Sequence, residues 1–224
     1  MKPEQRMLRD IEYEVECTRH LIGREAFAPR VMAAFEQVPR LDFVPSELHR
    51  RAYDNGPLPI GEGQTISQPY IVALMTDLLE TTPQDVILEV GTGSGYQAAI
   101  LSLLVKQVYS IEIIDTLATA ARERLQRLGY TNVEVRAADG YHGWPEHAPF
   151  DGILVTAAAP DIPEPLIEQL KPGGRLVVPV GLPYAYQELV LVEKAADKSV
   201  HTRSILGVAF VPLTRKYAAV KSHY

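Results

Sequence analysis

The second half of the chain alternates short apolar runs with stretches of helical spacing. The apolar runs have the length and composition of buried strands, and they cover residues 86–90, 107–112, 133–136, 150–155 and 175–180. Between several of these runs, apolar residues recur at helical intervals, over residues 97–105, 117–128 and 163–170. The repeated order of strand, helix and strand predicts a mostly parallel sheet that helices cover on both faces.

The first third of the chain shows helical spacing followed by an irregular stretch. Residues 4–53 are predicted to be helical, with one apolar face of Leu8, Ile11 and Val15 and another of Val31, Phe35 and Val38. Residues 54–69 are rich in glycine and proline and are predicted to be irregular. Long irregular loops in compact domains are often functional, so this segment is a candidate for the active site. Helical spacing returns over residues 71–79.

The pattern after residue 170 indicates how the sheet ends. Lys171-Pro172-Gly173-Gly174 predicts a turn that leads into the strand at 175–180. Two further strand-like runs, at about residues 188–193 and 200–207, flank the polar residues 194–199. This arrangement predicts a closing hairpin at one edge of the sheet.

The first predicted strand runs directly into a glycine loop. Glycine occupies alternate positions at Gly91, Gly93 and Gly95, as it must where a backbone turns tightly and lies against a ligand. The spacing differs from the GxGxxG of dinucleotide sites, and no Gly-Lys-Ser/Thr follows, so a phosphate ligand is disfavoured. Glu89 precedes the loop and favours a ligand with a positive charge, such as the sulfonium of S-adenosylmethionine. The alternative is a glycine turn without a ligand.

Acidic residues follow the next two predicted strands. Glu112 lies about 20 residues beyond the loop, where nucleotide-binding α/β folds place an acid for the ribose hydroxyls. Asp139-Gly140 follows the third strand, and its carboxylate is a candidate acceptor for the adenine amine. Taken alone, Glu112 is also compatible with a solvated strand end, and Asp139-Gly140 is also compatible with a simple turn.

Composition limits the class of protein. A chain of 224 residues is long enough for one α/β domain with a full core. The net charge is −6 with no run of lysine or arginine, which disfavours nucleic acid and anionic membranes as partners. Cys17 is the only cysteine and is expected to be buried, and the histidines show no metal-ligand spacing, so no metal is expected. Without a signal or membrane-spanning pattern, we expect a cytoplasmic protein.

Five segments together resemble the protein-L-isoaspartate O-methyltransferase family over nearly the whole chain. The most specific is the segment 60–70, with the sequence IGEGQTISQPY, which separates this family from its relatives. The others are residues 88–96 around the glycine loop, residues 150–160 with their Ala-Ala-Ala-Pro end, residues 170–181, and Phe210-Val211-Pro212-Leu213. The glycine loop alone indicates only a class I methyltransferase.

The resemblance implies a Rossmann-like class I methyltransferase fold of about seven mostly parallel strands. The expected single domain has an N-terminal helical extension (1–55), an active-site segment (56–70), and a core with closing strands (71–224). The implied methyl donor is S-adenosylmethionine, the product S-adenosylhomocysteine, and the substrate an isoaspartyl residue of a damaged peptide or protein. A monomer is expected. The chain departs from the family pattern at Ile113, where many members carry a polar or basic residue, and at Ala138, where glycine is usual.

Two groups of site residues follow from the residues and the resemblance together. The expected cofactor site consists of Gln64, Thr65, Ile66, Glu89, Gly91, Thr92, Gly93, Ser94, Glu112, Ile113, Asp139 and Gly140. The expected substrate site consists of Ser67, Thr156, Ala158 and Val211, with Ser67 as the catalytic residue.

The expected chemistry requires no general base. An isoaspartyl carboxylate has an ordinary pKa of about 4 and is already ionised at neutral pH. The protein must supply orientation and exclude water, which can contribute about 7–11 kcal/mol. The resemblance places Ser67 in the active site, where its hydroxyl would fix the carboxylate. The competing interpretation makes Ser67 the N-cap of the helix that begins near Pro69.

Three other functions remain open from the sequence. A methyltransferase of the same fold could act on a small-molecule acid or a ribosomal target. A non-catalytic adenosine-binding protein is disfavoured by the intact Gly91, Gly93, Gly95, Glu112 and Ser67. A nicotinamide oxidoreductase is disfavoured because the GxGxxG spacing is missing.

Overall fold

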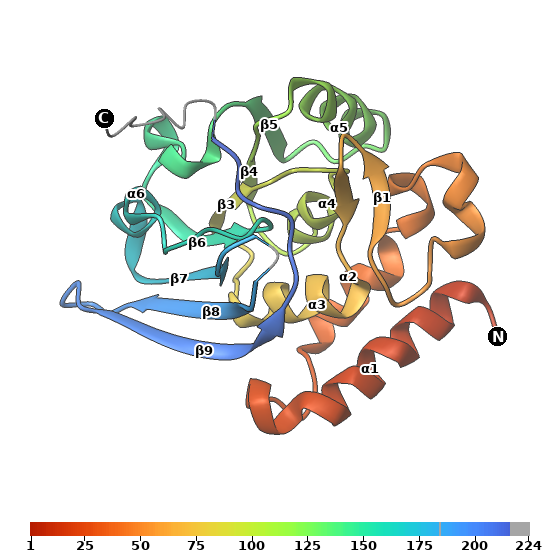
Figure 1. The fold of residues 1–224 in the computed structure, drawn as a ribbon, viewed down its shortest axis with the longest axis horizontal. Coiled ribbons are helices and arrows are strands. Elements are labelled where there is room, and N and C mark those ends of the chain that lie inside the picture. The colour runs from red at the N-terminus through yellow and green to blue at the C-terminus, as the bar shows by residue number, and fades with distance from the viewer. Residues whose placement is uncertain (184, 216–224) are drawn as a thin grey trace.

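A seven-stranded sheet forms the centre of the protein in its computed structural model, which describes residues 1–183 and 185–215 (Figure 1). The strands are β3 (Val86–Val90), β4 (Gln107–Glu112), β5 (Val133–Ala137), β6 (Phe150–Val155), β7 (Leu170–Val180), β8 (Gln187–Lys194) and β9 (Val200–Val208). Their spatial order is β5-β4-β3-β6-β7-β8-β9, and β8 pairs antiparallel with both of its neighbours while the other pairs are parallel. The predicted mostly parallel sheet and closing hairpin are therefore confirmed.

The strand order reverses beside β3. The chain runs from β3 outward to β4 and β5, and then returns to place β6 on the other side of β3. In open α/β sheets, ligands bind outside the carboxyl ends of the strands at such a reversal.

Both faces of the sheet are covered, because successive residues of a strand point to opposite faces. Ile87 packs in a core shared with residues of helices α1 to α5, whereas Leu88 packs in a second core shared with α6. The helices are α1 (Pro3–Ile22), α2 (Pro29–Gln37), α3 (Pro69–Leu78), α4 (Tyr96–Ser102), α5 (Asp115–Arg127) and α6 (Glu164–Glu168). Figure 1 shows α1 lying along α3 and β9.

One expectation for the helical extension is wrong. The buried face of α1 is formed by Met7, Ile11, Val15 and Ile22, with Leu8 half-buried beside it, and Cys17 is exposed. Two residues along an α-helix correspond to a rotation of about 200°, so Cys17 faces away from the side that buries Val15. The remainder of the extension includes two short 3₁₀ turns, Arg40–Phe43 and Ser46–Arg51.

The segment predicted to be irregular contains an antiparallel hairpin. Strand β1 (Leu58–Gly61) pairs with β2 (Gln64–Ile66), and the turn between them has positive φ angles at Gly61, Glu62 and Gly63. Its apolar positions are too few, and its glycine and proline too frequent, for the alternation to be visible in the sequence.

Three predicted boundaries also differ from the structure. The helix predicted at 97–105 ends at Ser102, and the helix predicted at 163–170 is reduced to Glu164–Glu168. Residues 171–174, predicted to be a turn, lie within β7, where the pairing with β6 is interrupted by a register shift. The backbone of this stretch is irregular, as a turn would be, with Gly173 at φ +84°. However, β7 pairs with β6 both before and after it, through Leu170 and Arg175.

Candidate active site

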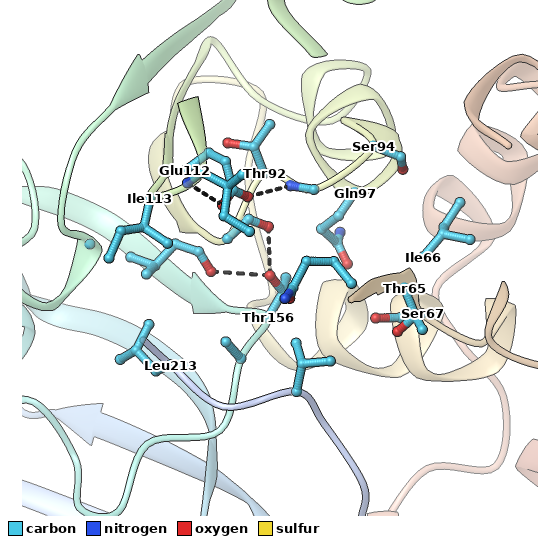
Figure 2. A pocket seen from close by; sticks show the side chains of 18 of the residues that line it. Thr65, Ile66, Ser67, Thr92, Ser94, Gln97, Glu112, Ile113, Thr156 and Leu213 are labelled. Atoms are coloured by element: carbon cyan, nitrogen blue, oxygen red, sulfur yellow. Dashed lines mark hydrogen bonds between the residues drawn. The ribbon is translucent and has the colours of Figure 1, made fainter. Parts of the chain in front are cut away.

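A cavity opens at the carboxyl edge of β3, β4 and β6, where the strand order reverses (Figure 2). Its walls come from the glycine loop, the ends of β4 and β6, the hairpin strand β2 and the segment 211–214. Thirteen of the sixteen predicted site residues line the cavity. They are Gln64, Thr65, Ile66, Ser67, Gly91, Thr92, Gly93, Ser94, Glu112, Ile113, Gly140, Thr156 and Val211. Glu89, Asp139 and Ala158 lie outside it.

The glycine loop is held by main-chain hydrogen bonds to the neighbouring strand. The amides of Gly91 and Thr92 both donate to the carbonyl of Ile111, at 2.7 and 3.2 Å. Gly91 has a φ of +98°, and a Cβ at this position would lie 2.2 Å from the hydroxyl oxygen of Thr156. Glycine is therefore required at Gly91 both by backbone conformation and by space.

Glu112 joins the loop to the end of β4. One carboxylate oxygen accepts from the amide of Gly93 at 2.8 Å, and the other accepts from the amide of Ile114 at 3.0 Å. A carboxylate has about four acceptor sites, so each oxygen keeps capacity for another donor. Among the described residues that line the cavity, Glu112 is the only Asp, Glu, Lys, Arg or His.

Glu89 lies beneath the loop and not in the cavity. Its side chain is fully buried, where it accepts a short hydrogen bond from Ser110, and the Ser110 hydroxyl lies 2.6 Å from that of Thr92. Burial raises the pKa of Glu89 to about 8, against the opposing effect of the Ser110 hydrogen bond. The other carboxyl oxygen has no hydrogen-bond partner among the described residues. Glu89 thus supports the loop through Ser110 and Thr92.

Of the two neighbouring residues Asp139 and Gly140, only Gly140 lines the cavity. Gly140 is in the lining, and a Cβ there would lie 2.4 Å from a methyl carbon of Val90. The Asp139 carboxylate accepts from the amide of Tyr141 at 3.0 Å and lies 3.8 Å from the guanidinium of Arg215. Asp139 therefore connects the end of β5 to the C-terminal segment.

A second groove adjoins the cavity and shares residues with it. Thr65, Ser67, Thr156 and Val211 line both, and the groove continues along Pro57, Ile71, Tyr186 and residues 207–210. The described residues that line this groove include no charged side chain. Figure 2 labels two of these shared residues, Thr65 and Ser67, on the same side of the cavity.

Ser67 is not the helix cap. The N-cap of α3 is Gln68, which makes no side-chain capping bond, and the Ser67 hydroxyl makes no hydrogen bond to the described residues. This hydroxyl is therefore available to a ligand at the junction. The Thr156 hydroxyl differs, because it donates to the carbonyls of Gly91, at 2.6 Å, and Val90, at 3.1 Å.

The segment after β9 crosses the end of β6 and closes the cavity. The amide of Ala158 donates to the carbonyl of Val211, and the amide of Leu213 donates to the carbonyl of Ala158, both at 2.8 Å. Ala158 is buried and acts only through its backbone. Figure 1 shows this segment running from β9 across the carboxyl edge of the sheet.

Several lining residues were missed by the sequence reasoning. Gln97 is buried in α4 and donates to the Thr76 hydroxyl at 2.8 Å, and its polar side chain in an apolar helical run was a usable signal. Pro212, Leu213 and Thr214 also line the cavity. Pro212 and Leu213 belong to a segment that carries the family resemblance, from which only Val211 was expected at the site.

The residues present fit S-adenosylmethionine. Glu112 lines the cavity, and each of its carboxylate oxygens has capacity for another donor besides a main-chain amide, as a pair of ribose hydroxyls requires. Ile113 and Leu213 line the cavity with apolar side chains, against which an adenine ring could pack. Residues Gly91 to Ser94 form another wall, where two glycines leave the main chain accessible to a ligand. The described residues contain no group of three or more His, Cys, Asp or Glu side chains placed to hold a metal ion. Nor does any helix in residues 1–183 or 185–215 have the length and apolar character needed to cross a bilayer.

The sheet order, the glycine loop and the acid at the end of β4 together define a class I methyltransferase fold. A sequence model of the Protein-L-isoaspartate(D-aspartate) O-methyltransferase (PCMT) family matches residues 18–218. The chain belongs to this family, and it is accordingly an S-adenosylmethionine-dependent methyltransferase.

Full-length relatives support the assignment. Protein-L-isoaspartate O-methyltransferase 2 of Nitrosococcus oceani is 61% identical over 217 residues, which cover 97% of this chain and 99% of the relative. The enzyme of the same name from Syntrophobacter fumaroxidans is 62% identical over 209 residues, covering 93% of this chain and 85% of the relative.

Solved structures agree on the fold. A protein-L-isoaspartate O-methyltransferase superposes with a TM-score of 0.81 at 28% identity, covering 93% of this chain, which spans 65% of that protein. A Plasmodium falciparum structure, described as a protein of this kind in complex with S-adenosyl-L-homocysteine, gives a TM-score of 0.73 at 24% identity, with 92% and 98% of the two chains covered.

Proposed function

We propose that this protein methylates the α-carboxylate of L-isoaspartyl residues in damaged peptides and proteins, with the reaction taking place at Ser67. The observation that carries the site assignment is the free Ser67 hydroxyl at the junction of the two cavities. In the methyl ester formed there, the neighbouring backbone nitrogen can attack the ester carbonyl away from the enzyme, which closes a succinimide and releases methanol. Hydrolysis of the succinimide returns some normal aspartate, which is repair.

The residues divide between holding the cofactor and holding the substrate. S-adenosylmethionine, when bound, supplies the methyl group. Glu112 holds the ribose hydroxyls, Ile113 and Leu213 lie against the base, and Gly91 to Ser94 line the remainder of the cavity. Asp139 lies outside the lining, and its carboxylate keeps acceptor sites for the adenine amine besides its contacts with Tyr141 and Arg215.

The second groove receives the peptide. Because no charged side chain lines it among the described residues, the isoaspartyl carboxylate meets neutral donors, of which Ser67 is uncommitted. Thr156 acts as an acceptor toward the peptide, because its proton is directed at the Gly91 carbonyl. Val211, which Ala158 holds in place, forms one wall of the groove.

One comparison tests the substrate. Two peptides of the same sequence, one with an isoaspartyl and one with an aspartyl residue, are incubated with labelled S-adenosylmethionine. We expect methylation of the isoaspartyl peptide, with the aspartyl peptide far poorer, and no rise in rate that requires deprotonation near pH 9. Equal rates on the two peptides would contradict the proposal, as would turnover only with a small-molecule acid.

We further propose that the protein is cytoplasmic, with neither nucleic acid nor membrane as partner. The net charge of −6 supports this proposal, since binding of both polyanions depends on clustered positive charge. A cell fractionation in which the protein sediments with membranes or ribosomes would contradict it.

A further inference from the structure

Arg40 is a fully buried arginine without an acidic partner in the part of the chain that the structure describes. It begins the 3₁₀ turn Arg40–Phe43, and its exposed fraction is 0%. Its Nε donates to the carbonyl of Ala52 at 2.9 Å, and one terminal nitrogen donates to the carbonyl of Gly56 at 3.3 Å. The other terminal nitrogen has no hydrogen-bond partner among the described residues. Burial lowers the pKa of Arg40 to about 10, so the side chain remains cationic at neutral pH.

Stability does not explain an arginine at this position. A buried charge without a counter-ion is costly, and apolar side chains of similar volume can replace buried ionic groups without loss of stability. The groups that Arg40 contacts offer a different explanation.

On one side, Arg40 holds the backbone that leads to the hairpin. Gly56 lies two residues before β1, and the chain passes from there through β1 and β2 to Ser67. The hairpin supplies Gln64, Thr65 and Ile66 to the cavity wall. By binding the carbonyls of Ala52 and Gly56, Arg40 therefore fixes the backbone from which the hairpin wall extends.

On the other side, Arg40 contacts the helix that follows the glycine loop. Its guanidinium carbon lies 5.1 Å from the ring centroid of Tyr96, over the ring face, a favourable cation–π arrangement. Tyr96 is the first residue of α4, lines the cavity, and makes an edge contact with Phe43 at 5.4 Å. The same guanidinium thus contacts the segment before the hairpin, through Gly56, and the first residue of α4 after the glycine loop, through Tyr96.

We propose that Arg40 is a positioning residue for methyl transfer: it keeps the wall that carries Ser67 at a fixed spacing from the glycine loop. The inference rests on the proposed role of the Ser67 junction. A donor and an acceptor bound on separate walls react only when the walls hold them within a narrow distance, so a small change of spacing lowers the rate of the bound complex.

The test compares Arg40→Met and Arg40→Lys with the wild type. The methionine variant removes both carbonyl contacts and the charge, and the lysine variant keeps the charge but replaces the planar guanidinium, whose Nε and terminal nitrogen each contact one carbonyl, with a single nitrogen atom. For each, S-adenosylhomocysteine affinity is measured by calorimetry, and the single-turnover rate on an isoaspartyl peptide is measured with saturating substrates and corrected for the folded fraction by circular dichroism. We expect both variants to lose about tenfold or more in single-turnover rate, while S-adenosylhomocysteine affinity changes by a smaller factor.

Arg30→Met is the matched control. Arg30 also belongs to the extension and also donates to two main-chain carbonyls, those of Thr81 and Leu104, but neither leads to the cavity. Its variant is expected to unfold at a lower temperature and to keep the wild-type single-turnover rate. The inference is overturned if a folded Arg40 variant reacts at the wild-type rate, or if Arg30→Met slows the reaction equally. If Arg40→Met does not fold, Arg40→Lys decides by the same criterion. A wild type that is inactive on the isoaspartyl peptide counts against the proposed function instead.

Discussion

At the scale of single residues, the structure separates side chains that face the cavity from those that support it. Glu112 and Glu89 are both acids at the end of a strand, yet only Glu112 lines the cavity. Their positions in the parallel sheet differ, because Glu112 ends β4 whereas Glu89 precedes the last residue of β3 and points into the interior. An acid at a strand end is therefore not by itself a ligand-binding residue.

Ser67→Ala is expected to slow methyl transfer by about tenfold or more while S-adenosylmethionine affinity stays within a few-fold. The reason is that the hydroxyl orients the reacting carboxylate, so its loss acts mainly on the transition state. Single-turnover rates and thermal unfolding are measured on the same preparation. Ser204→Ala, on the exposed edge of β9, is the control and should match the wild type in both measurements. A Ser67→Ala variant with the wild-type single-turnover rate would remove Ser67 from the catalytic assignment.

The raised pKa of Glu89 should make the stability of the protein depend on pH. Its pKa lies at about 8 in the folded protein, above the ordinary value of 4.5. Between these values the unfolded chain releases a proton that the folded chain retains, so the free energy of unfolding falls as pH rises, by up to about 1.4 kcal/mol per pH unit. Glu89→Gln does not titrate and should lack this contribution.

Urea unfolding of both proteins between pH 5 and 8 measures the effect. The difference in unfolding free energy should shift in favour of Glu89→Gln as pH increases. Parallel curves would show that Glu89 has the same pKa in the folded and unfolded states.

At the scale of elements, the hairpin β1–β2 packs Leu58 and Ile66 into the core and also makes polar contacts at its base and its tip. Its base is fixed through Gly56 and Arg40, and its tip contacts the start of α5, where the Thr116 hydroxyl donates to the Glu62 carboxylate at 2.9 Å. The hydrogen bond between Thr116 and Glu62 at the tip is exposed. Cofactor exchange past this wall should therefore be sensitive to the tip.

Glu62→Ala is expected to speed the dissociation of S-adenosylhomocysteine by a few-fold. A single hydrogen bond of this kind contributes about 0.5–1.5 kcal/mol, which limits the effect to roughly tenfold. Stopped-flow dissociation rates are compared for Glu62→Ala, Thr116→Ala and the double variant. If the contact is responsible, the double variant behaves like either single one. Glu36→Ala, an exposed acid on α2, controls for the change in charge, and additive effects in the double variant would exclude the proposed contact.

At the scale of the whole molecule, the site exists because distant segments meet at one edge of the sheet. The cavity combines the hairpin, the ends of β3, β4 and β6, and the segment after β9. We expect the chain to complete this site as a monomer, because each of these walls comes from the same chain. Sedimentation velocity should give the mass of a single chain, 24.8 kDa. A stable dimer with activity that depends on protein concentration would contradict this prediction.

The sequence alone determined the sheet, the glycine loop and the family segment, because each depends on neighbouring residues. Strands β4 and β6 match their predicted bounds, since buried strands are short apolar runs with glycine or polar residues beside them. Glu112 and Gly140 lie in the cavity lining, since both lie at or just beyond the carboxyl end of a strand, where ligands bind in open α/β sheets.

Only the tertiary structure decided the remainder. Whether Glu89 faced a ligand or the interior depended on how β3 packs against β4 and Ser110, which no local pattern records. The crossing of residues 211–214 over Ala158 and the contact of Arg40 with Tyr96 join residues far apart in sequence. Such contacts depend on the packing of complete elements, and local hydrophobic periodicity contains no information about them.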